Sequence, residues 1–306
     1  SAAVTVEAAC ENTPDGTEVL FAIEGVGEQT AAVQGGKAVT VFHIENVHLW
    51  DGVADPYLYS IAASLPDGDA VAVHFGCRKI AFKPVTGFWL NGRNVRLVGA
   101  ARHQDRAGLG NALTSAEHEE DMQLLRDIGA NTVRLAHYQH AQYFYDLCDK
   151  YGLVAWAEIP YITEHMPEAT ANTLSQMEEL VLQNYNHPSI ICWGLSNEIT
   201  VTTGVTEDLT ANHRLLNDLC HRLDSTRPTT MAHAFMLNPN DPFVQLPDIC
   251  SYNLYYGWYL GELQQNDEFF DTFHKNHPDR VIGLSEFGAD ANPAYQSARP
   301  ECGDWS

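Results

Sequence analysis

The feature that most constrains this sequence is a regular alternation, from about residue 85 onward, between short apolar segments and longer helical ones. The apolar segments are typical of strands that a parallel sheet buries on both faces. Because their spacing is even and no nucleotide-type glycine loop accompanies them, the pattern favours a (β/α)8 barrel over a doubly wound sheet. The expected strands are 95–103, 131–138, 153–160, 190–198, 229–235, 249–256 and 281–288.

The clearest helical segment, residues 114–129, shows how these strands are connected. Thr114 and Glu117 have the spacing of a capping box at its start, and Gly129 is suited to end it. The apolar stripe expected to pack against the sheet consists of Met122, Leu125 and Ile128.

A barrel of this kind needs an eighth strand, and that strand has to follow residues 281–288 after another helix. Only ADANPAYQSARPECGDWS remains at that point. We therefore expect residues 85–306 to form a C-terminally truncated barrel domain of which seven strands are visible. Such an open sheet leaves edges on its first and seventh strands, which predicts self-association, for example as a homo-oligomer.

Residues 1–84 have a different rhythm. Short stretches of alternating apolar and polar residues, such as EVLFAIEG and KAVTVFHIEN, are separated by turn signals such as TPDG and QGG. This pattern predicts a separate β-sandwich domain of about immunoglobulin size.

Composition excludes several kinds of partner. The net charge of −23 argues against nucleic acid and anionic membranes, which would repel the chain. No apolar run is long enough to span a bilayer, and the first 20 residues lack the pattern of a signal peptide, so a cytoplasmic location is expected. The seven cysteines form no C-x-x-C pair and are expected to be buried thiols.

In a (β/α)8 barrel the chemistry takes place at the carboxyl ends of the strands, so the residues that end each strand are candidates for the site. Any one of them has a structural alternative, because an acid at a strand end often caps a helix or pairs with an arginine; Glu158 is the clearest case. The set is less easily explained by packing alone. It consists of His103, His137, Glu158, Asn197, Glu198, His233, Tyr255, Tyr256 and Glu286.

Two acids, Glu198 and Glu286, each end an otherwise apolar strand. Two carboxyl groups that face each other across a barrel mouth are what glycoside cleavage needs, one to donate a proton and one to meet the sugar carbon. A separation of about 5 to 5.5 Å leads to retention of configuration, whereas about 6.5 to 9.5 Å admits a water molecule and leads to inversion. A purely structural pair of acids is the alternative.

Five ordered motifs, GAARHQDR, NTVRLAHY, CDKYGLVAWAEIP, WGLSNE and LSEFG, resemble glycoside hydrolase family 2, which contains β-galactosidases and β-glucuronidases. The resemblance implies that residues 1–84 are the family's immunoglobulin-like domain and that residues 85–306 are its catalytic TIM barrel. It also implies a retaining exo-β-glycosidase with Glu198 as general acid/base and Glu286 as nucleophile. Asn197 would hold the sugar 2-hydroxyl.

Four further positions follow from the same resemblance. His103 and His137 match histidines that line the sugar pocket, and Tyr255 matches a tyrosine that hydrogen-bonds the nucleophile, with Tyr252 and Tyr256 as rivals. Arg134, three residues before His137, is expected to pair with the nucleophile. For the histidines and tyrosines, bonding into the barrel rim is the structural alternative.

The sugar and the cofactor are less directly indicated. RHQDR and EIPYITEHM are more similar to the galactosidase branch, which makes a β-galactosidase the first expectation, with a β-glucuronidase as the alternative. The family's large galactosidases bind magnesium through a Glu-x-His pair, but Glu164 and His165 are adjacent here, so no metal or other cofactor is expected. A carbohydrate is the expected partner. A different kind of hypothesis is a non-catalytic fragment with weak sugar binding.

Overall fold

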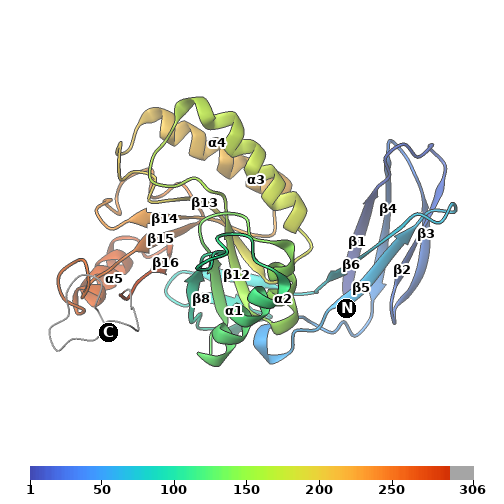
Figure 1. Ribbon diagram of the computed structural model, residues 1–306, viewed down its shortest axis with the longest axis horizontal. Helices are drawn as coiled ribbons and strands as arrows, with labels where there is room; N and C mark the ends of the chain where they lie inside the picture. Colours follow the sequence, from blue (N-terminus) through green and yellow to red (C-terminus); the bar gives the residue numbers. More distant parts are fainter. Residues whose placement is uncertain (290–306) are drawn as a thin grey trace.

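The computed structural model describes residues 1–289, and the place expected for an eighth strand lies outside the described residues. Two regions are evident in Figure 1: a smaller β-sheet region that contains the N-terminus and a larger region of strands and helices. Among the described residues, no helix has the length and apolar character needed to cross a bilayer.

The N-terminal region consists of two antiparallel sheets. One pairs β1 with β4, and the other has the order β3-β2-β5-β6. Alternate side chains of both sheets are buried in one shared core that includes Phe21, Phe42 and Tyr59, as the alternating pattern predicts. The strands are β1 (Ala2–Ala9), β2 (Glu18–Ile23), β3 (Gly27–Ala32), β4 (Lys37–Ile44), β5 (Tyr59–Ser64) and β6 (Ala70–Phe75).

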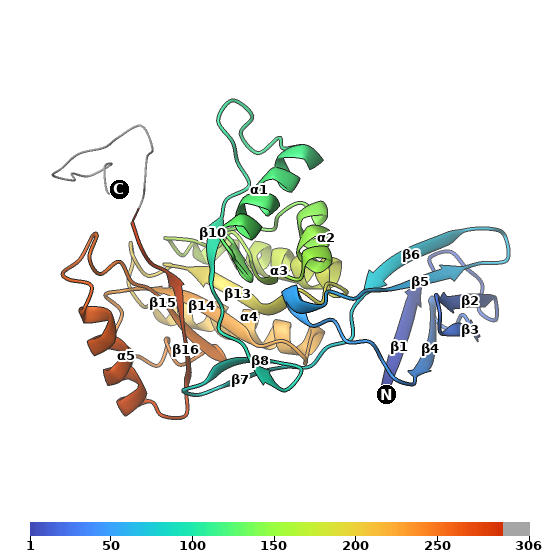
Figure 2. The ribbon, with the colours of Figure 1, turned by 90° about the horizontal axis from the view of Figure 1, so that it is seen from below.

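A short antiparallel sheet follows and lies across the ends where the strands of the parallel sheet begin (Figure 2). Phe88 and Leu90 of this sheet pack with Trp50 against Val154 and Ile191, which lie near the start of two barrel strands. This layer excludes water from that end of the parallel sheet, so the other end is left for a site. The strands are β7 (Ile80–Lys83), β8 (Gly87–Leu90) and β9 (Arg93–Asn94), preceded by the 3-10 turn η1 (Gly52–Ala54).

The larger region is built on a curled, seven-stranded parallel sheet whose spatial order follows the sequence (Figure 2). All seven strands predicted from the apolar segments are present. Within the described residues, β10 and β16 form the two edges of this sheet. The strands are β10 (Gly99–Arg102), β11 (Thr132–Leu135), β12 (Val154–Glu158), β13 (Ile190–Asn197), β14 (Thr229–Ala234), β15 (Ile249–Asn253) and β16 (Val281–Glu286).

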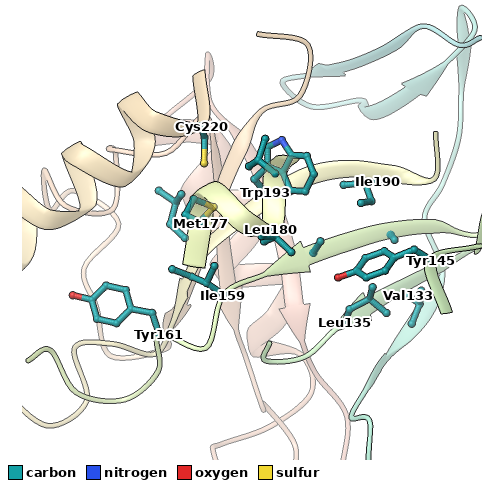
Figure 3. Packing of buried hydrophobic residues seen from close by; sticks show 14 of the residues in the cluster. Val133, Leu135, Tyr145, Ile159, Tyr161, Met177, Leu180, Ile190, Trp193 and Cys220 are labelled. Carbon is teal, nitrogen blue, oxygen red and sulfur yellow. The ribbon is translucent and has the colours of Figure 1, made fainter. Parts of the chain in front are cut away.

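Helices cover the outer face of this sheet. α2 contacts β12, α3 contacts β12 and β13, and α4 contacts β13 and β14. Figure 3 shows this core, in which Met177, Leu180 and Cys220 of the helices pack with Trp193 of β13. Within the described residues, no helix connects β14 to β15. The helices are α1 (Ser115–Asp127), α2 (Gln142–Tyr151), η2 (Pro167–Ala169), α3 (Thr170–Asn184), α4 (Glu207–Leu223) and α5 (Gln265–Asn276).

Helix α1 confirms most of what its sequence predicts. Thr114 and Glu117 form the capping box, and both Met122 and Leu125 are buried. The third residue assigned to the apolar stripe, Ile128, is 69% exposed, so that assignment was wrong. The helix ends at Asp127, and the backbone of Ile128 has already left helical geometry, which turns its side chain away from the buried face.

The cysteines of the described residues are free thiols, as expected. Burial raises the pKa of most of them, for example Cys148 and Cys192, so they pack as small apolar groups. The buried ones are Cys10, Cys148, Cys192, Cys220 and Cys250, while Cys77 is partly exposed and Cys302 lies outside the described residues.

Candidate active site

The two predicted acids stand at the carboxyl ends of their strands. Glu286 is the last residue of β16, and Glu198 follows the last residue of β13 directly. Glu198 has a φ of 45°, and its backbone N–H donates to the carbonyl of Ala232 on β14 at 2.8 Å. Left-handed backbone is unusual for a residue with a side chain, and it turns the chain at the point where the acid leaves the strand.

One buried asparagine links the two strand ends. The Nδ2 of Asn253 donates to Oε1 of Glu198 at 3.1 Å and to Oδ1 of Asn197 at 3.2 Å. Its Oδ1 accepts a hydrogen bond from the hydroxyl of Ser285, the neighbour of Glu286, at 2.7 Å. The acids of β13 and β16 therefore belong to one site, bridged by β15. The sequence analysis missed Asn253, because the expected strand 249–256 placed it in the strand interior, whereas β15 ends at Asn253.

Arg134 is at the centre of this site. Its guanidinium is 5% exposed and donates to Oε1 of Glu286 at 2.6 Å, to both oxygens of Glu158 at 3.0 Å and to Oδ1 of Asn197 at 2.9 Å. Burial acts to lower the pKa of Arg134, but Glu158 and Glu286 outweigh it and raise that pKa. The predicted pairing of Arg134 with Glu286 is thus present in the structure. A planar guanidinium has donors that point in several directions, so it can hold three accepting residues at once. The compact ammonium group of a lysine is less suited to this role.

Glu158 is fully buried beside Arg134 and also meets His137, whose Nδ1 lies 2.6 Å from Oε1. Burial would raise the pKa of Glu158, but the charge of Arg134 and the hydrogen bond from His137 lower it below its ordinary value. Glu158 therefore pairs with an arginine, which was the structural explanation considered for this strand-end acid. Its negative charge orients Arg134 and the Nδ1 side of the His137 ring.

His137 and His103 lie at the rim of this site. Nε2 of His137 is 3.6 Å from Oε1 of Glu286, so its ring reaches both Glu158 and Glu286. The exposed ring of His103 contacts that of His137 edge to face, with 5.1 Å between their centroids. His137 is therefore a neighbour of Glu286, and His103 lies beside His137.

Tyr255 is the tyrosine that reaches Glu286. Its hydroxyl donates to Oε2 of Glu286, and burial together with this hydrogen bond raises the pKa of Tyr255. The rival Tyr252 is on the opposite face of the chain, and its hydroxyl donates to the carbonyl of Leu237 at 2.9 Å. Tyr256 packs at the edge of the cluster that contains Tyr252.

His233, the remaining strand-end histidine, is not part of this site. Its ring packs between Phe243 and Tyr252, at centroid distances of 5.8 and 5.4 Å. Burial lowers its pKa to about 3, so it is a neutral core residue.

The residues that would correspond to a magnesium site do not fit a metal ion. Nε2 of His165 lies 2.6 Å from Oδ2 of Asp208, and its Nδ1 is hydrogen-bonded to the hydroxyl of Tyr161. Both ring nitrogens of His165 are engaged in hydrogen bonds, so neither is free to coordinate a cation. Among the described residues, no group of three or more His, Cys, Asp and Glu side chains is arranged to hold a metal.

A curled parallel sheet with two carboxylates at its carboxyl ends, one of them bound by a buried arginine, defines a (β/α)-barrel domain with the kind of acidic site that glycoside cleavage uses. The family model "Glycosyl hydrolases family 2, TIM barrel domain" matches residues 83–298. The chain belongs to glycosyl hydrolase family 2, as the motifs predicted.

Relatives with known names agree with this assignment. A β-glucuronidase of Bacteroides fragilis is 40% identical over 86% of this chain and 39% of that relative. The crystal structure of an FMN-binding β-glucuronidase from Faecalibacterium prausnitzii L2-6 superposes with a TM-score of 0.89, at 38% identity, over 96% of this chain and 47% of that one. A putative β-galactosidase from Bacteroides fragilis has the same TM-score at 35% identity, over 97% of this chain and 46% of that one. The chain thus spans less than half the length of each.

Proposed function

We propose that the complete gene product is a retaining exo-β-glycosidase in which Glu198 is the general acid/base and Glu286 the nucleophile. The observation that carries this proposal is the unequal environment of the two carboxylates. Glu286 accepts hydrogen bonds from the cation Arg134 and from Tyr255, whereas the hydrogen bond that the structure gives to the Glu198 carboxylate comes from the neutral amide of Asn253. Two carboxyl groups in unequal surroundings are suited to different roles.

The chemistry then has two steps. In the first, a carboxylate oxygen of Glu286 attacks the anomeric carbon while Glu198 gives its proton to the departing glycosidic oxygen, so the C–O bond to the aglycone breaks and an ester to Glu286 forms. In the second, ionised Glu198 removes a proton from water, the water oxygen attacks the same carbon, and Glu286 leaves. Two inversions give net retention.

The surrounding residues support these steps by binding and orientation. The Oδ1 of Asn197 faces Arg134 and Asn253, which leaves its amide nitrogen as a donor toward the sugar 2-hydroxyl. Arg134 and Tyr255 each hold one oxygen of Glu286, and each oxygen keeps a second lone pair with which it can attack the anomeric carbon. His103 and His137 would contact the sugar from the rim.

For the sugar, we propose a β-D-glucuronide first and a β-D-galactoside second. The sequence motifs favoured galactosides, but two relatives that match 86% of this chain, at 40% and 33% identity, are named β-glucuronidase and putative β-glucuronidase. A relative named β-galactosidase, from Thermoanaerobacterium thermosulfurigenes, is 33% identical over 71% of this chain.

We further propose that residues 1–84 form the family's immunoglobulin-like domain. Two packed antiparallel sheets with a shared core support this assignment. A cytoplasmic location and self-association through the sheet edges also remain proposals.

The test is hydrolysis of p-nitrophenyl β-D-glucuronide and β-D-galactoside by the complete gene product and by the 306-residue chain, each compared with its Glu286→Gln variant. Glu179→Gln, an exposed change on α3, is the matched control. We expect cleavage of the glucuronide, lost in Glu286→Gln alone, and NMR of the first-formed product should show the β-anomer. Cleavage of neither substrate by the complete protein would overturn the assignment, and activity confined to the complete protein would support the hypothesis that this chain alone is a non-catalytic fragment.

A further inference from the structure

The segment that follows β12 runs beside the end of β13, next to Glu198. The N–H of Asn197 donates to the carbonyl of Tyr161 at 3.0 Å, and the N–H of Thr163 donates to the carbonyl of Asn197 at 3.1 Å. These two bonds hold Asn197, the residue immediately before Glu198, from one side. On the other side, the N–H of Glu198 is bonded to Ala232 of β14.

The side chain of Tyr161 enters a chain of polar side chains that reaches α4. Nε2 of His165 lies 2.6 Å from the carboxylate of Asp208 and therefore carries the proton that it donates. Nδ1 of His165 is then an acceptor, and the hydroxyl of Tyr161 donates to it. The same hydroxyl accepts a hydrogen bond from Nδ2 of Asn212 on α4 at 3.1 Å.

A second connection links the same helix to β13. Nδ1 of His213 donates to the carbonyl of Leu209 at 2.9 Å, and its Nε2 is 2.8 Å from the hydroxyl of Ser196. The ring of Tyr161 stacks on that of His213, with 5.1 Å between their centroids. The first half of α4 is thus tied to the residues on both sides of the Tyr161–Asn197 contact.

Two of the three groups, Tyr161 and His165, are buried, and the two-step mechanism uses none of the three. Tyr161 is 6% exposed and His165 is 8% exposed, whereas the carboxylate of Asp208 reaches solvent. Buried polar side chains are costly unless they are fully hydrogen-bonded, so such a chain is expected to specify one arrangement of the backbone around it.

Glu198 is a residue that needs such support. Its φ of 45° is costly for a residue with a side chain and persists only where the surroundings determine it from several sides. If the contact on the Asn197 side loosens, the backbone of Glu198 is free to relax, and a displacement of about 1 Å is enough to impair a catalytic group.

We propose that Tyr161, His165 and Asp208 are positioning residues that hold the segment after β12 against Asn197 and thereby set the position of Glu198. The catalytic consequence rests on the proposed function, in which Glu198 is the acid/base. The effect on the backbone, a firmly held Asn197 at the end of β13, does not depend on the proposed function and is tested separately.

The backbone consequence is measured by hydrogen–deuterium exchange of the Asn197 amide in Tyr161→Phe and Asp208→Asn. We expect exchange at least about 10-fold faster than in the unchanged protein. Tyr145→Phe is the matched control, because it removes another buried hydroxyl, one that accepts from the N–H of His140 on the far side of the region, and it should leave the Asn197 amide unchanged. Asp208 is exposed at the surface, so Asp208→Asn serves if Tyr161→Phe fails to fold.

The catalytic consequence is measured with aryl glycosides whose leaving phenols differ in acidity. A misplaced acid slows the departure of a poor leaving group, while a good leaving group needs little protonation. In Tyr161→Phe and Asp208→Asn we expect kcat/KM to fall about 10-fold or more for the phenyl glycoside and less than about 2-fold for the dinitrophenyl glycoside.

Equal losses for all leaving groups, or an Asn197 amide that exchanges as slowly as in the Tyr145→Phe control, would overturn the inference. If the unchanged protein cleaves neither sugar, the proposed function fails, and the amide exchange still decides whether these residues position the end of β13.

Discussion

Nη1 of Arg134 lies 2.6 Å from Oε1 of Glu286, although 152 residues separate the two in the chain. The same guanidinium binds Glu158 and Asn197, so one cation on β11 connects that strand to the carboxyl ends of three others, β12, β13 and β16. This arrangement places a positive charge at one oxygen of the proposed nucleophile before any substrate binds.

Arg134→Lys is expected to reduce kcat/KM about 100-fold, because an ammonium group, with three donors on one nitrogen, cannot reproduce the four hydrogen bonds of the guanidinium to Glu158, Asn197 and Glu286. The free energy of unfolding should also fall by about 2 kcal/mol, since Glu158 keeps a buried charge with a poorer partner. Steady-state kinetics and urea denaturation check both effects. Arg126→Lys on the surface of α1 is the control, and equal effects in the two variants would contradict the central role of Arg134.

Tyr255→Phe is expected to lower kcat about 10-fold with little change in KM, because it removes the hydroxyl that donates to Oε2 of Glu286. Tyr252→Phe removes a hydroxyl that is bonded to the carbonyl of Leu237 and should cost about 1 kcal/mol of stability while leaving kcat unchanged. Parallel kinetics of the two variants check the assignment, and a larger kcat loss in Tyr252→Phe would show that the wrong tyrosine was assigned.

Gly194→Ala is expected to destabilise the protein by about 1–3 kcal/mol and to impair activity. An added methyl group would meet Cβ of Glu158 and Nε1 of Trp156, each at 2.5 Å, and would push Glu158 away from Arg134. Gly283→Ala is a milder comparison on β16, because its nearest neighbour is the hydroxyl of Ser251 at 2.9 Å. Thermal denaturation should rank Gly194→Ala as the more damaging change.

The stability of the protein is expected to fall as the pH falls from about 6.5 towards about 4. Burial lowers the pKa of His140 and His233 to about 3 and that of His213 to about 4. Below the ordinary histidine pKa of 6.5, the unfolded chain binds protons that the folded chain does not, so the stabilisation is complete above that pH and is lost on acidification.

Urea midpoints at about pH 7.5 and about pH 5 measure this loss. His233→Phe removes one of the three groups while keeping an aromatic ring between Phe243 and Tyr252, and it should reduce the difference between the two midpoints. An unchanged difference would show that His233 titrates normally in the folded protein.

Much of this architecture was predictable because it depends on local patterns. Apolar segments of strand length predicted the seven parallel strands, and the capping residues Thr114 and Glu117 predicted the start of α1. The rule that barrel chemistry lies at the carboxyl ends of strands then selected Glu198 and Glu286. Ile128 was the exception, because the exact end of a helix depends on where its backbone departs from helical geometry.

The sequence by itself therefore determined the order of the seven strands, the family and the two proposed catalytic acids, because periodicity and strand-end position depend on neighbouring residues. The helix expected between β14 and β15 is absent from the described residues. Only the tertiary structure decided that Asn253 bridges the strand ends, that Tyr255 rather than Tyr252 meets Glu286, and that His233 packs into the core. Side chains alternate between the two faces of a strand, but which face becomes the barrel interior depends on how distant strands pair. The contact between Arg134 and Glu286 exists for the same reason: it forms only when the sheet curls.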